Sequence, residues 1–361
     1  MKTLSFVSIL TMLLGLTTVS LAGNSNDAKL HYVEFSQLGN PAEVLKVKTE
    51  SARSLQSGEV RVKVLATPIH PSNLLQISGN YGVDPTLPST PGSEGVGRVI
   101  ETSAEVTHLK KGQLVLLVGG GTWRDEIVAP AAGFLPLPDL GNPSSEVIEQ
   151  LSMTAVNPLS ALLMLTSFVE LKEGDWIVHS AANSSVGGYI IQLAKQRGVK
   201  TVNIVRREGL AKDLMAKGGD VVLIDGPDLA QQIGNATGNA PISLGIDAVG
   251  GATFTRLAQS LANGGTMVSY GVLSGQPVTL NPAMTIFNDI RIRGFWLSKW
   301  FETSTMEEKQ AAFGGIIPMI ASGALKADVD SRFTVSEIKQ AVTRAAQRGR
   351  NGKVLIVPNA N

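Results

Sequence analysis

In the first third of the chain, short apolar runs alternate with glycine and proline. Five of these runs have the length and alternation of β-strands, at residues 30–35, 44–48, 59–66, 97–101 and 114–118. Strands this short, separated by turn residues, are typical of an antiparallel, barrel-like domain. We therefore expect such a domain to follow the N-terminal segment.

From Pro158 onward the apolar pattern alternates between strands and helices. Pro158 suits the first turn of a helix, with Asn157 as its cap. Short apolar runs then predict strands at 176–178, 201–205, 221–224, 244–247 and 266–270, and helical spacing predicts helices at 188–197, 210–217 and 254–261. This alternation predicts an α/β fold with a parallel, doubly wound sheet.

The chain beyond Trp300 is expected to return to the first domain, because a helix at 306–321 is followed by a final strand at 354–357. The doubly wound domain is then inserted into the first one. We place the domain boundaries as follows: residues 23–156 for the first domain, 157–296 for the inserted domain and 297–361 for the return.

Residues 1–22 have the pattern of a secretory signal peptide. Lys2 precedes an apolar run, and Ser20 and Ala22 place small residues at the cleavage positions. We therefore expect an exported mature protein, periplasmic or secreted, or a cytoplasmic one if this segment is not a leader. An uncleaved anchor is the alternative, and no other stretch is long and apolar enough to span a bilayer.

The composition is that of a compact globular protein with no affinity for nucleic acid. Of the 361 residues, 43% are hydrophobic and 17% are charged, and the 31 basic residues balance 30 acidic ones without forming a basic stripe. The chain has no cysteine, which excludes disulfides, thiol nucleophiles and cysteine-ligated zinc. Its four histidines are not at metal-site spacing, so we predict no metal.

A turn of small residues lies between the strand at 176–178 and the helix that follows. Ala182, Ser184 and Gly187 occupy the positions of the G-x-G-x-x-G fingerprint, of which only the last glycine is kept. Small side chains allow the backbone to approach a pyrophosphate, and the helix N-terminus favours its negative charge. The pattern indicates a dinucleotide site, and an ordinary strand–turn–helix remains the alternative.

Arg206 and Arg207 stand after the second strand of this domain, where an acidic ribose ligand is usual. Guanidinium groups bind a 2′-phosphate, whereas a carboxylate repels it. The pair therefore favours NADPH. Because Glu208 is acidic and next to them, NADH remains the alternative cofactor. The alternative for the two arginines is that they are solvated residues at the end of a strand and bind no cofactor.

Seven stretches, which include Gly79-Asn-Tyr-Gly82 and Gly294-Phe-Trp-Leu-Ser298, together resemble one family. They lie at residues 79–82, 91–97, 121–124, 182–187, 249–251, 264–271 and 294–300. The family is that of the mitochondrial-type trans-2-enoyl-thioester reductases, in the zinc-free, quinone oxidoreductase-like branch of the medium-chain dehydrogenase/reductases. The resemblance implies a GroES-like catalytic domain and an inserted Rossmann domain that binds NADP.

The activity that this resemblance implies is hydride transfer from NADPH to the β-carbon of a 2-enoyl thioester, such as an enoyl-CoA or enoyl-ACP. Tyr81 matches the family's proton donor or enolate stabiliser, and Trp296 matches the same site. A positioned O–H donor suits this reaction, because hydride addition places negative charge on the thioester oxygen. The alternatives are a loop-pinning turn residue for Tyr81 and a core aromatic for Trp296.

The resemblance also implies a set of cofactor contacts. Asn157 would lie at the nicotinamide, although a helix cap explains it equally well, and Lys353 would contact the cofactor, although a surface lysine is the alternative. The remaining expected contacts are, for the pyrophosphate, Asn183, Ser184, Ser185, Val186 and Gly187; for the ribose, Arg206, Arg207 and Glu208; and, for the nicotinamide pocket, Tyr270, Gly271, Val272, Leu273, Phe295, Trp296, Leu297 and Ser298.

The chain also departs from the family pattern. Ser185 replaces a glycine of the phosphate turn, His70 replaces an asparagine and Asn73 replaces an aspartate. Ser93 stands where zinc-dependent relatives carry a ligand histidine before Glu94. The changes at His70 and Asn73 leave the substrate preference open.

Two other functions remain open at this point. One is an NADPH-dependent quinone or enone reductase of the same superfamily. The other is an exported, non-catalytic binding protein, favoured by Ser185 and by the leader, since NADPH is not normally available outside the cell interior. The family expectation for assembly is a homodimer paired edge to edge through the cofactor-domain sheets.

Overall fold

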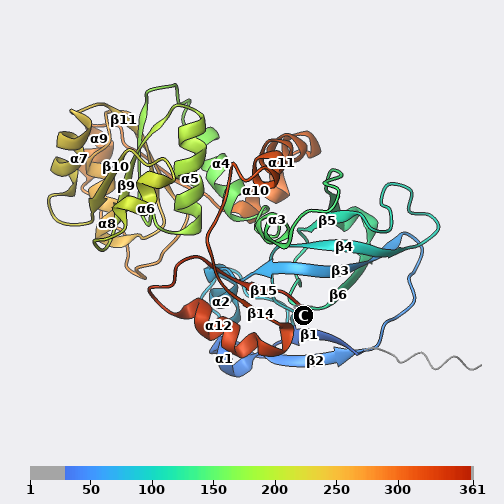
Figure 1. Cartoon of the computed structure of the whole chain (residues 1–361). Coiled ribbons are helices and arrows are strands. Elements are labelled where there is room, and N and C mark those ends of the chain that lie inside the picture. Colours follow the sequence, from blue (N-terminus) through green and yellow to red (C-terminus); the bar gives the residue numbers. More distant parts are fainter. Residues whose placement is uncertain (1–28, 359–361) are drawn as a thin grey trace, which may run out of the picture.

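The computed structural model describes residues 29–358, and Figure 1 shows them arranged around two large β-sheets. One sheet has seven strands and the other has six. A separate pair, β1 (Leu30–Glu34) and β2 (Lys46–Glu50), lies beside the first sheet. The α/β fold class predicted from the sequence is confirmed.

The seven-stranded sheet is mostly antiparallel and runs in the order β14-β15-β3-β4-β5-β7, with β6 also paired to β3. Val60, Val62 and Val64 alternate along its longest strand and point into one apolar cluster, as the two-residue period of a strand requires. The strands are β3 (Glu59–Pro68), β4 (Gly95–Thr102), β5 (Leu114–Leu117), β6 (Glu126–Pro130), β7 (Phe134–Pro136), β14 (Val329–Phe333) and β15 (Lys353–Ile356).

Short helices accompany this sheet, and one of them corrects the prediction of a strand at 44–48. Asn40 caps a helix that Pro41 begins, so Val44 is helical and the strand starts at Lys46. The helices of this part are α1 (Pro41–Val44), α2 (Pro71–Ile77), η1 (Ala131–Gly133), α3 (Ser145–Leu151), η2 (Val335–Glu337) and α12 (Ile338–Ala346).

The six-stranded sheet is entirely parallel and runs in the order β10-β9-β8-β11-β12-β13. This doubly wound arrangement agrees with the one predicted from the alternation of strands and helices. The strands are β8 (Trp176–His179), β9 (Lys200–Val205), β10 (Val221–Ile224), β11 (Ile242–Asp247), β12 (Thr266–Ser269) and β13 (Arg291–Gly294).

Helices cover both faces of the parallel sheet, with α5 on one side and α7 and α8 on the other (Figure 1). Neighbouring residues of β8 show this, because Ile177 packs into one apolar cluster and Val178 into another. The helices of this part are α4 (Asn157–Thr166), α5 (Ser185–Gln196), α6 (Ala211–Ala216), α7 (Leu229–Thr237), α8 (Gly251–Gln259), α9 (Pro282–Ile286), α10 (Leu297–Thr303) and α11 (Met306–Ala321).

The two sheets share one continuous apolar core. Leu116 of β5 and Leu151 of α3 belong to the same buried cluster as Ile177 of β8 and Tyr189 of α5. After α11 the chain returns through β14 and β15 to the first sheet. The junction between the sheets is therefore a packed interface that can hold side chains from both parts in fixed positions.

The predicted signal peptide at residues 1–22 lies outside the described residues. Within residues 29–358, none of the helices combines the length and the apolar character that crossing a bilayer requires.

Candidate active site

The turn of small residues connects β8 to α5 at the carboxyl end of the parallel sheet. Ser184 caps α5, and its side-chain oxygen accepts a hydrogen bond of 3.1 Å from the Gly187 N–H. Ala181 has a φ of 49°, a left-handed conformation that is uncommon for a residue with a side chain. The free N–H groups at the start of a 12-residue helix follow this turn, and such a helix start attracts phosphate groups.

Gly187 is the one glycine of the fingerprint that the packing itself demands. A Cβ added at Gly187 would lie 2.5 Å from the Ala182 carbonyl oxygen and 2.7 Å from its Cα. Helix α5 and the end of β8 therefore approach too closely for any side chain. This close approach explains why the last glycine is kept although the first two are replaced by Ala182 and Ser184.

Arg206 and Arg207 lie after β9, at the same edge of the sheet as the turn, because β8 and β9 are adjacent and parallel. Both arginines and Glu208 are exposed. The loop before β15 comes close to them, since a Cβ at Gly349 would lie 4.0 Å from Arg207 Nη1. The arrangement leaves two guanidinium groups beside the expected ribose position.

The segments expected at the nicotinamide follow two neighbouring strands, β12 and β13, which pair in parallel and so end at the same edge. Gly271 packs tightly, because a Cβ there would lie 2.8 Å from the Ala248 carbonyl oxygen. The residues after β12 are Tyr270, Gly271, Val272 and Leu273, and those after β13 are Phe295, Trp296, Leu297 and Ser298.

Asn157 is buried at the start of α4. The helix begins at Asn157 itself, and the residue in the cap position is Val156, which makes no side-chain capping bond. The capping role that we considered for Asn157 is therefore wrong. Its contact with the cofactor stays a prediction.

Tyr81 and Trp296 meet although 215 residues separate them in the sequence. The Trp296 Nε1–H donates a hydrogen bond of 3.0 Å to the Tyr81 Oη. Tyr81 follows α2 of the first part, whereas Trp296 follows β13 of the parallel sheet. Because the indole occupies an acceptor position of the phenol oxygen, the Tyr81 hydroxyl keeps its own hydrogen to donate elsewhere.

A cluster of three buried ionisable side chains lies at the junction of the two parts. His70 Nε2 is 2.7 Å from Glu94 Oε1, and Lys353 Nζ is 2.8 Å from His70 Nδ1. All three are buried. Burial raises the pKa of Glu94 and lowers the pKa values of Lys353 and His70. The attraction between Glu94 and Lys353 opposes the pKa shifts of Glu94 and Lys353.

This cluster, which we call the buried trio, was only partly visible in the sequence. Lys353 was expected at the cofactor, but its ammonium group contacts His70 in the interior. The surface alternative for Lys353 is therefore wrong, and its cofactor contact stays a prediction. Glu94 was noted only as the neighbour of Ser93. The signal for Glu94 was a carboxylate directly before the buried, glycine-rich start of β4, where a buried charge demands a partner.

Within residues 29–358, no group of three or more histidine, aspartate or glutamate side chains is placed so that it could hold a metal ion. Ser93, at the position of the zinc-ligand histidine, accepts instead a hydrogen bond of 2.6 Å from the Asn73 side-chain amide.

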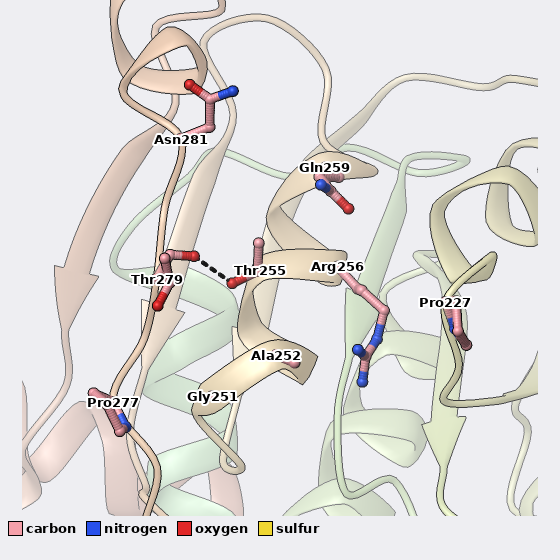
Figure 2. Close-up of a pocket in the computed structure, with 9 residues that line it drawn as sticks. All are labelled: Pro227, Gly251, Ala252, Thr255, Arg256, Gln259, Pro277, Thr279 and Asn281. Atoms are coloured by element: carbon pink, nitrogen blue, oxygen red, sulfur yellow. Dashed lines mark hydrogen bonds between the residues drawn. The ribbon is translucent and has the colours of Figure 1, made fainter.

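A separate hollow of about 410 Å³ opens between α8 and the segment before α9 (Figure 2). Thr255 Oγ1 donates a hydrogen bond of 2.6 Å to the Thr279 carbonyl across it. Arg256 is engaged by Asp225 through two hydrogen bonds of 2.7 and 2.8 Å. No predicted site residue lines this hollow, so it is distinct from the candidate active site.

Comparison with known families matches both parts of the chain. The family model described as an alcohol dehydrogenase GroES-like domain matches residues 56–139, and the one described as a zinc-binding dehydrogenase matches residues 185–312. With these matches, the fold and the site define an oxidoreductase of the medium-chain dehydrogenase/reductase class, in its zinc-free branch.

Two curated relatives indicate which family of this oxidoreductase class the chain belongs to. The mitochondrial enoyl-[acyl-carrier-protein] reductase of Rattus norvegicus is 35% identical over 335 residues, covering 91% of this chain and 88% of the relative. The enzyme of the same name from Dictyostelium discoideum is 35% identical over 333 residues, covering 90% of this chain and 93% of the relative. The chain belongs to this family of enoyl reductases.

Solved structures agree with this assignment. The complex of Etr1p with NADP and crotonyl-CoA has a TM-score of 0.82 at 28% identity, over 91% of this chain and 99% of that one. A mycobacterial quinone oxidoreductase has a TM-score of 0.77 at 25% identity, over 91% of this chain and 100% of that one.

The expectation that the protein is exported is contradicted by the curated relatives. These are named as mitochondrial enzymes, which work inside the cell and are not exported.

The close approach at Gly187 predicts the effect of a single methyl group. Gly187→Ala would push α5 away from the Ala182 carbonyl and reshape the turn, so we expect NADPH to bind at least about tenfold more weakly, a loss of roughly 1.4 kcal/mol. The matched control is Gly188→Ala, whose Cβ would find its nearest neighbour at 3.9 Å and should leave binding intact. A fluorescence titration of NADPH measures both, and equal affinities would contradict the argument.

Proposed function

We propose that this protein is an NADPH-dependent reductase that transfers hydride to the β-carbon of a 2-enoyl thioester, an enoyl-CoA or enoyl-ACP, and so acts in fatty-acyl metabolism. The observation that carries the proposal is the hydrogen bond between Tyr81 and Trp296. It holds a phenol from the first part of the chain against the segment expected to line the nicotinamide.

In this proposal NADPH, when bound, supplies the hydride, and the protein stabilises the negative charge that hydride addition creates on the substrate. Negative charge develops on the thioester oxygen as an enolate. The Tyr81 hydroxyl donates its hydrogen toward that oxygen, while Trp296 fixes the orientation of the phenol from the other side. A donor that is already oriented stabilises this charge strongly, because no free energy is spent on reorienting it during the reaction.

Cofactor binding is proposed to follow the edge of the parallel sheet. The turn at Asn183, Ser184, Ser185, Val186 and Gly187 would hold the pyrophosphate. Arg206 and Arg207 would bind the 2′-phosphate, beside Glu208. Asn157 and the segments after β12 and β13 would line the nicotinamide.

A reductase for quinones or other enones is the second candidate function. It is supported by the likeness to a mycobacterial quinone oxidoreductase, and by His70 and Asn73, which depart from the enoyl-reductase pattern close in sequence to Tyr81. Activity on quinones without activity on enoyl thioesters would favour it.

We also propose a homodimer paired through β13. This strand forms one edge of the six-stranded sheet, and all four of its residues are exposed. Exposed apolar side chains lie on this strand and just before it in the chain, since Ile292 of β13 is 44% exposed, Ile286 69% and Phe287 79%. An exposed strand edge with apolar neighbours favours pairing with a second copy.

Removal of the phenolic hydroxyl tests the role of Tyr81. We expect Tyr81→Phe to lower kcat for NADPH oxidation with crotonyl-CoA by about 10²-fold or more, because a positioned proton donor contributes about that much. NADPH affinity should hardly change. Tyr32→Phe, which removes a hydroxyl from β1 in the separate two-stranded sheet, is the matched control. If the wild type binds NADPH but oxidises it with no enoyl thioester, the proposed activity is excluded.

Removal of one guanidinium group tests the choice of cofactor. We expect Arg206→Ala to weaken NADPH binding by roughly 10- to 100-fold, the value of a charge-assisted hydrogen bond, and to leave NADH binding almost unchanged. Calorimetric titration with both cofactors measures the difference, and Arg98→Ala serves as a control. Equal losses for NADPH and NADH would show that Arg206 does not recognise the 2′-phosphate.

The dimer proposal predicts a change in mass. Phe287→Glu places a charge at the exposed edge and should convert a dimer into a monomer in light scattering, since burying an unpaired charge is costly. Met215→Glu replaces a side chain that is 56% exposed on α6, beside the opposite edge of the sheet, and should leave the mass unchanged. A wild type that is monomeric at micromolar concentration would refute the pairing.

A further inference from the structure

The buried trio links segments that lie far apart in the sequence. Glu94 precedes β4, His70 precedes α2, and Lys353 begins β15. His70 is 24 residues from Glu94 and 283 residues from Lys353. His70 lies between the carboxylate and the ammonium group, within hydrogen-bond distance of both.

The hydrogen-bond pattern of the trio is complete in two arrangements. In the first, Lys353 Nζ donates to His70 Nδ1, and the His70 Nε2–H donates to Glu94 Oε1. In the second, Glu94 donates from Oε1 to Nε2, and the Nδ1–H donates to a neutral Lys353 Nζ. One proton moving from Nζ to Nδ1 and one from Nε2 to Oε1 converts the first into the second, with no change in net charge or in protons bound.

The second oxygen of Glu94 reaches the start of α4. Glu94 Oε2 accepts hydrogen bonds from the backbone N–H groups of Ala155, at 2.6 Å, and Val156, at 2.9 Å. These residues lead directly into Asn157, the residue expected at the nicotinamide. The position of this backbone therefore depends on where the Glu94 carboxyl group is held.

Glu94 is also fixed through its backbone. Its carbonyl oxygen accepts hydrogen bonds from Thr67 Oγ1, at 2.6 Å, and from Thr122 Oγ1, at 3.0 Å. Two further ionisable groups act on the trio: Arg350 adds positive charge near Lys353, and the buried phenol of Tyr189 feels the charge of Glu94. His70 is the only member of the trio that contacts both of the others.

We propose that His70 is a positioning residue for hydride transfer: by bridging Lys353 and Glu94, it holds the Glu94 carboxyl group against the Ala155 and Val156 N–H groups and so fixes Asn157 at the nicotinamide. This role rests on the proposed reductase function. It is a property of this chain in particular, because His70 is one of its departures from the family pattern.

Two substitutions at His70 separate positioning from simple support of the fold. His70→Leu removes both hydrogen bonds, whereas His70→Gln can still donate to Glu94 from an amide nitrogen that reaches the place of Nε2, and its amide oxygen can accept from Lys353. The measurement is the single-turnover rate of NADPH oxidation with crotonyl-CoA, per titrated NADPH site. We expect His70→Leu to slow this rate about tenfold or more, as small displacements near reacting groups do, and His70→Gln to restore most of it.

The affinity for NADPH supplies the second readout. It should change by less than about threefold in His70→Leu, because the pyrophosphate turn and the arginines are untouched, and a threefold change is only about 0.65 kcal/mol. If His70→Leu lowers only the yield of folded protein and leaves the rate per site unchanged, His70 is merely structural and the proposal is overturned. A rate in His70→Gln as low as that in His70→Leu overturns it as well.

Nitrogen NMR of the wild type keeps the proposal testable if His70→Leu does not fold. The chain has four histidines, and the signals missing from His70→Gln identify those of His70. We expect a neutral His70 ring from pH 6 to pH 9, since both arrangements keep it neutral. A His70 ring that gains a proton in this range overturns the bridge.

The proposed function and the role of His70 can fail separately. A wild type that shows no turnover with enoyl thioesters removes both. A wild type that turns over, together with an unaffected His70→Leu, removes only the role of His70.

Discussion

The Glu94 carboxyl group is the constraint on which the junction of this molecule depends. A carboxyl group without contact to solvent must have its hydrogen bonds satisfied, and leaving such a group without its partner costs about 1–3 kcal/mol. The partners of Glu94 come from the segment after β3, from the start of α4 and, through His70, from β15. The requirement to satisfy one buried group therefore ties the first sheet to the entry of the second.

The chemistry of the site is divided between the two parts that this junction joins. The parallel sheet contributes backbone: a turn too tight for any side chain at Gly187 and a helix start that favours phosphate. The first part contributes the proposed donor, Tyr81, and the hydrogen bond from Trp296 crosses from one part to the other. A substrate held between the two parts would meet both contributions in fixed geometry.

The sequence could predict those helices and strands that have a local pattern of apolar residues. Apolar periodicity located the parallel sheet and placed the helix 306–321 at its observed bounds. It missed β13 and β14, because Arg291–Gly294 is fully exposed and Val329–Phe333 contains three polar residues, so neither has an apolar pattern. Asn157 was placed one position outside its helix, since helix ends depend on backbone geometry that composition does not encode.

The site could be predicted only where a motif marked it. The turn at Gly187 and the arginines followed from general rules, and Tyr81 and Trp296 from a family resemblance. The buried trio could not be predicted, because contacts between residues 283 positions apart leave no local signal. The sequence showed that His70 departs from the family pattern, but only the folded chain shows that Glu94 and Lys353 are its partners.

The most direct test of the proposed hydride transfer is to find which product atom receives the hydride. The wild-type protein would be given NADPH deuterated at the transferable C4 position, together with crotonyl-CoA, and the product analysed by NMR. The account predicts butyryl-CoA with a single deuterium on the β-carbon. A product with deuterium elsewhere, or unchanged crotonyl-CoA beside a protein that binds NADPH, would contradict it.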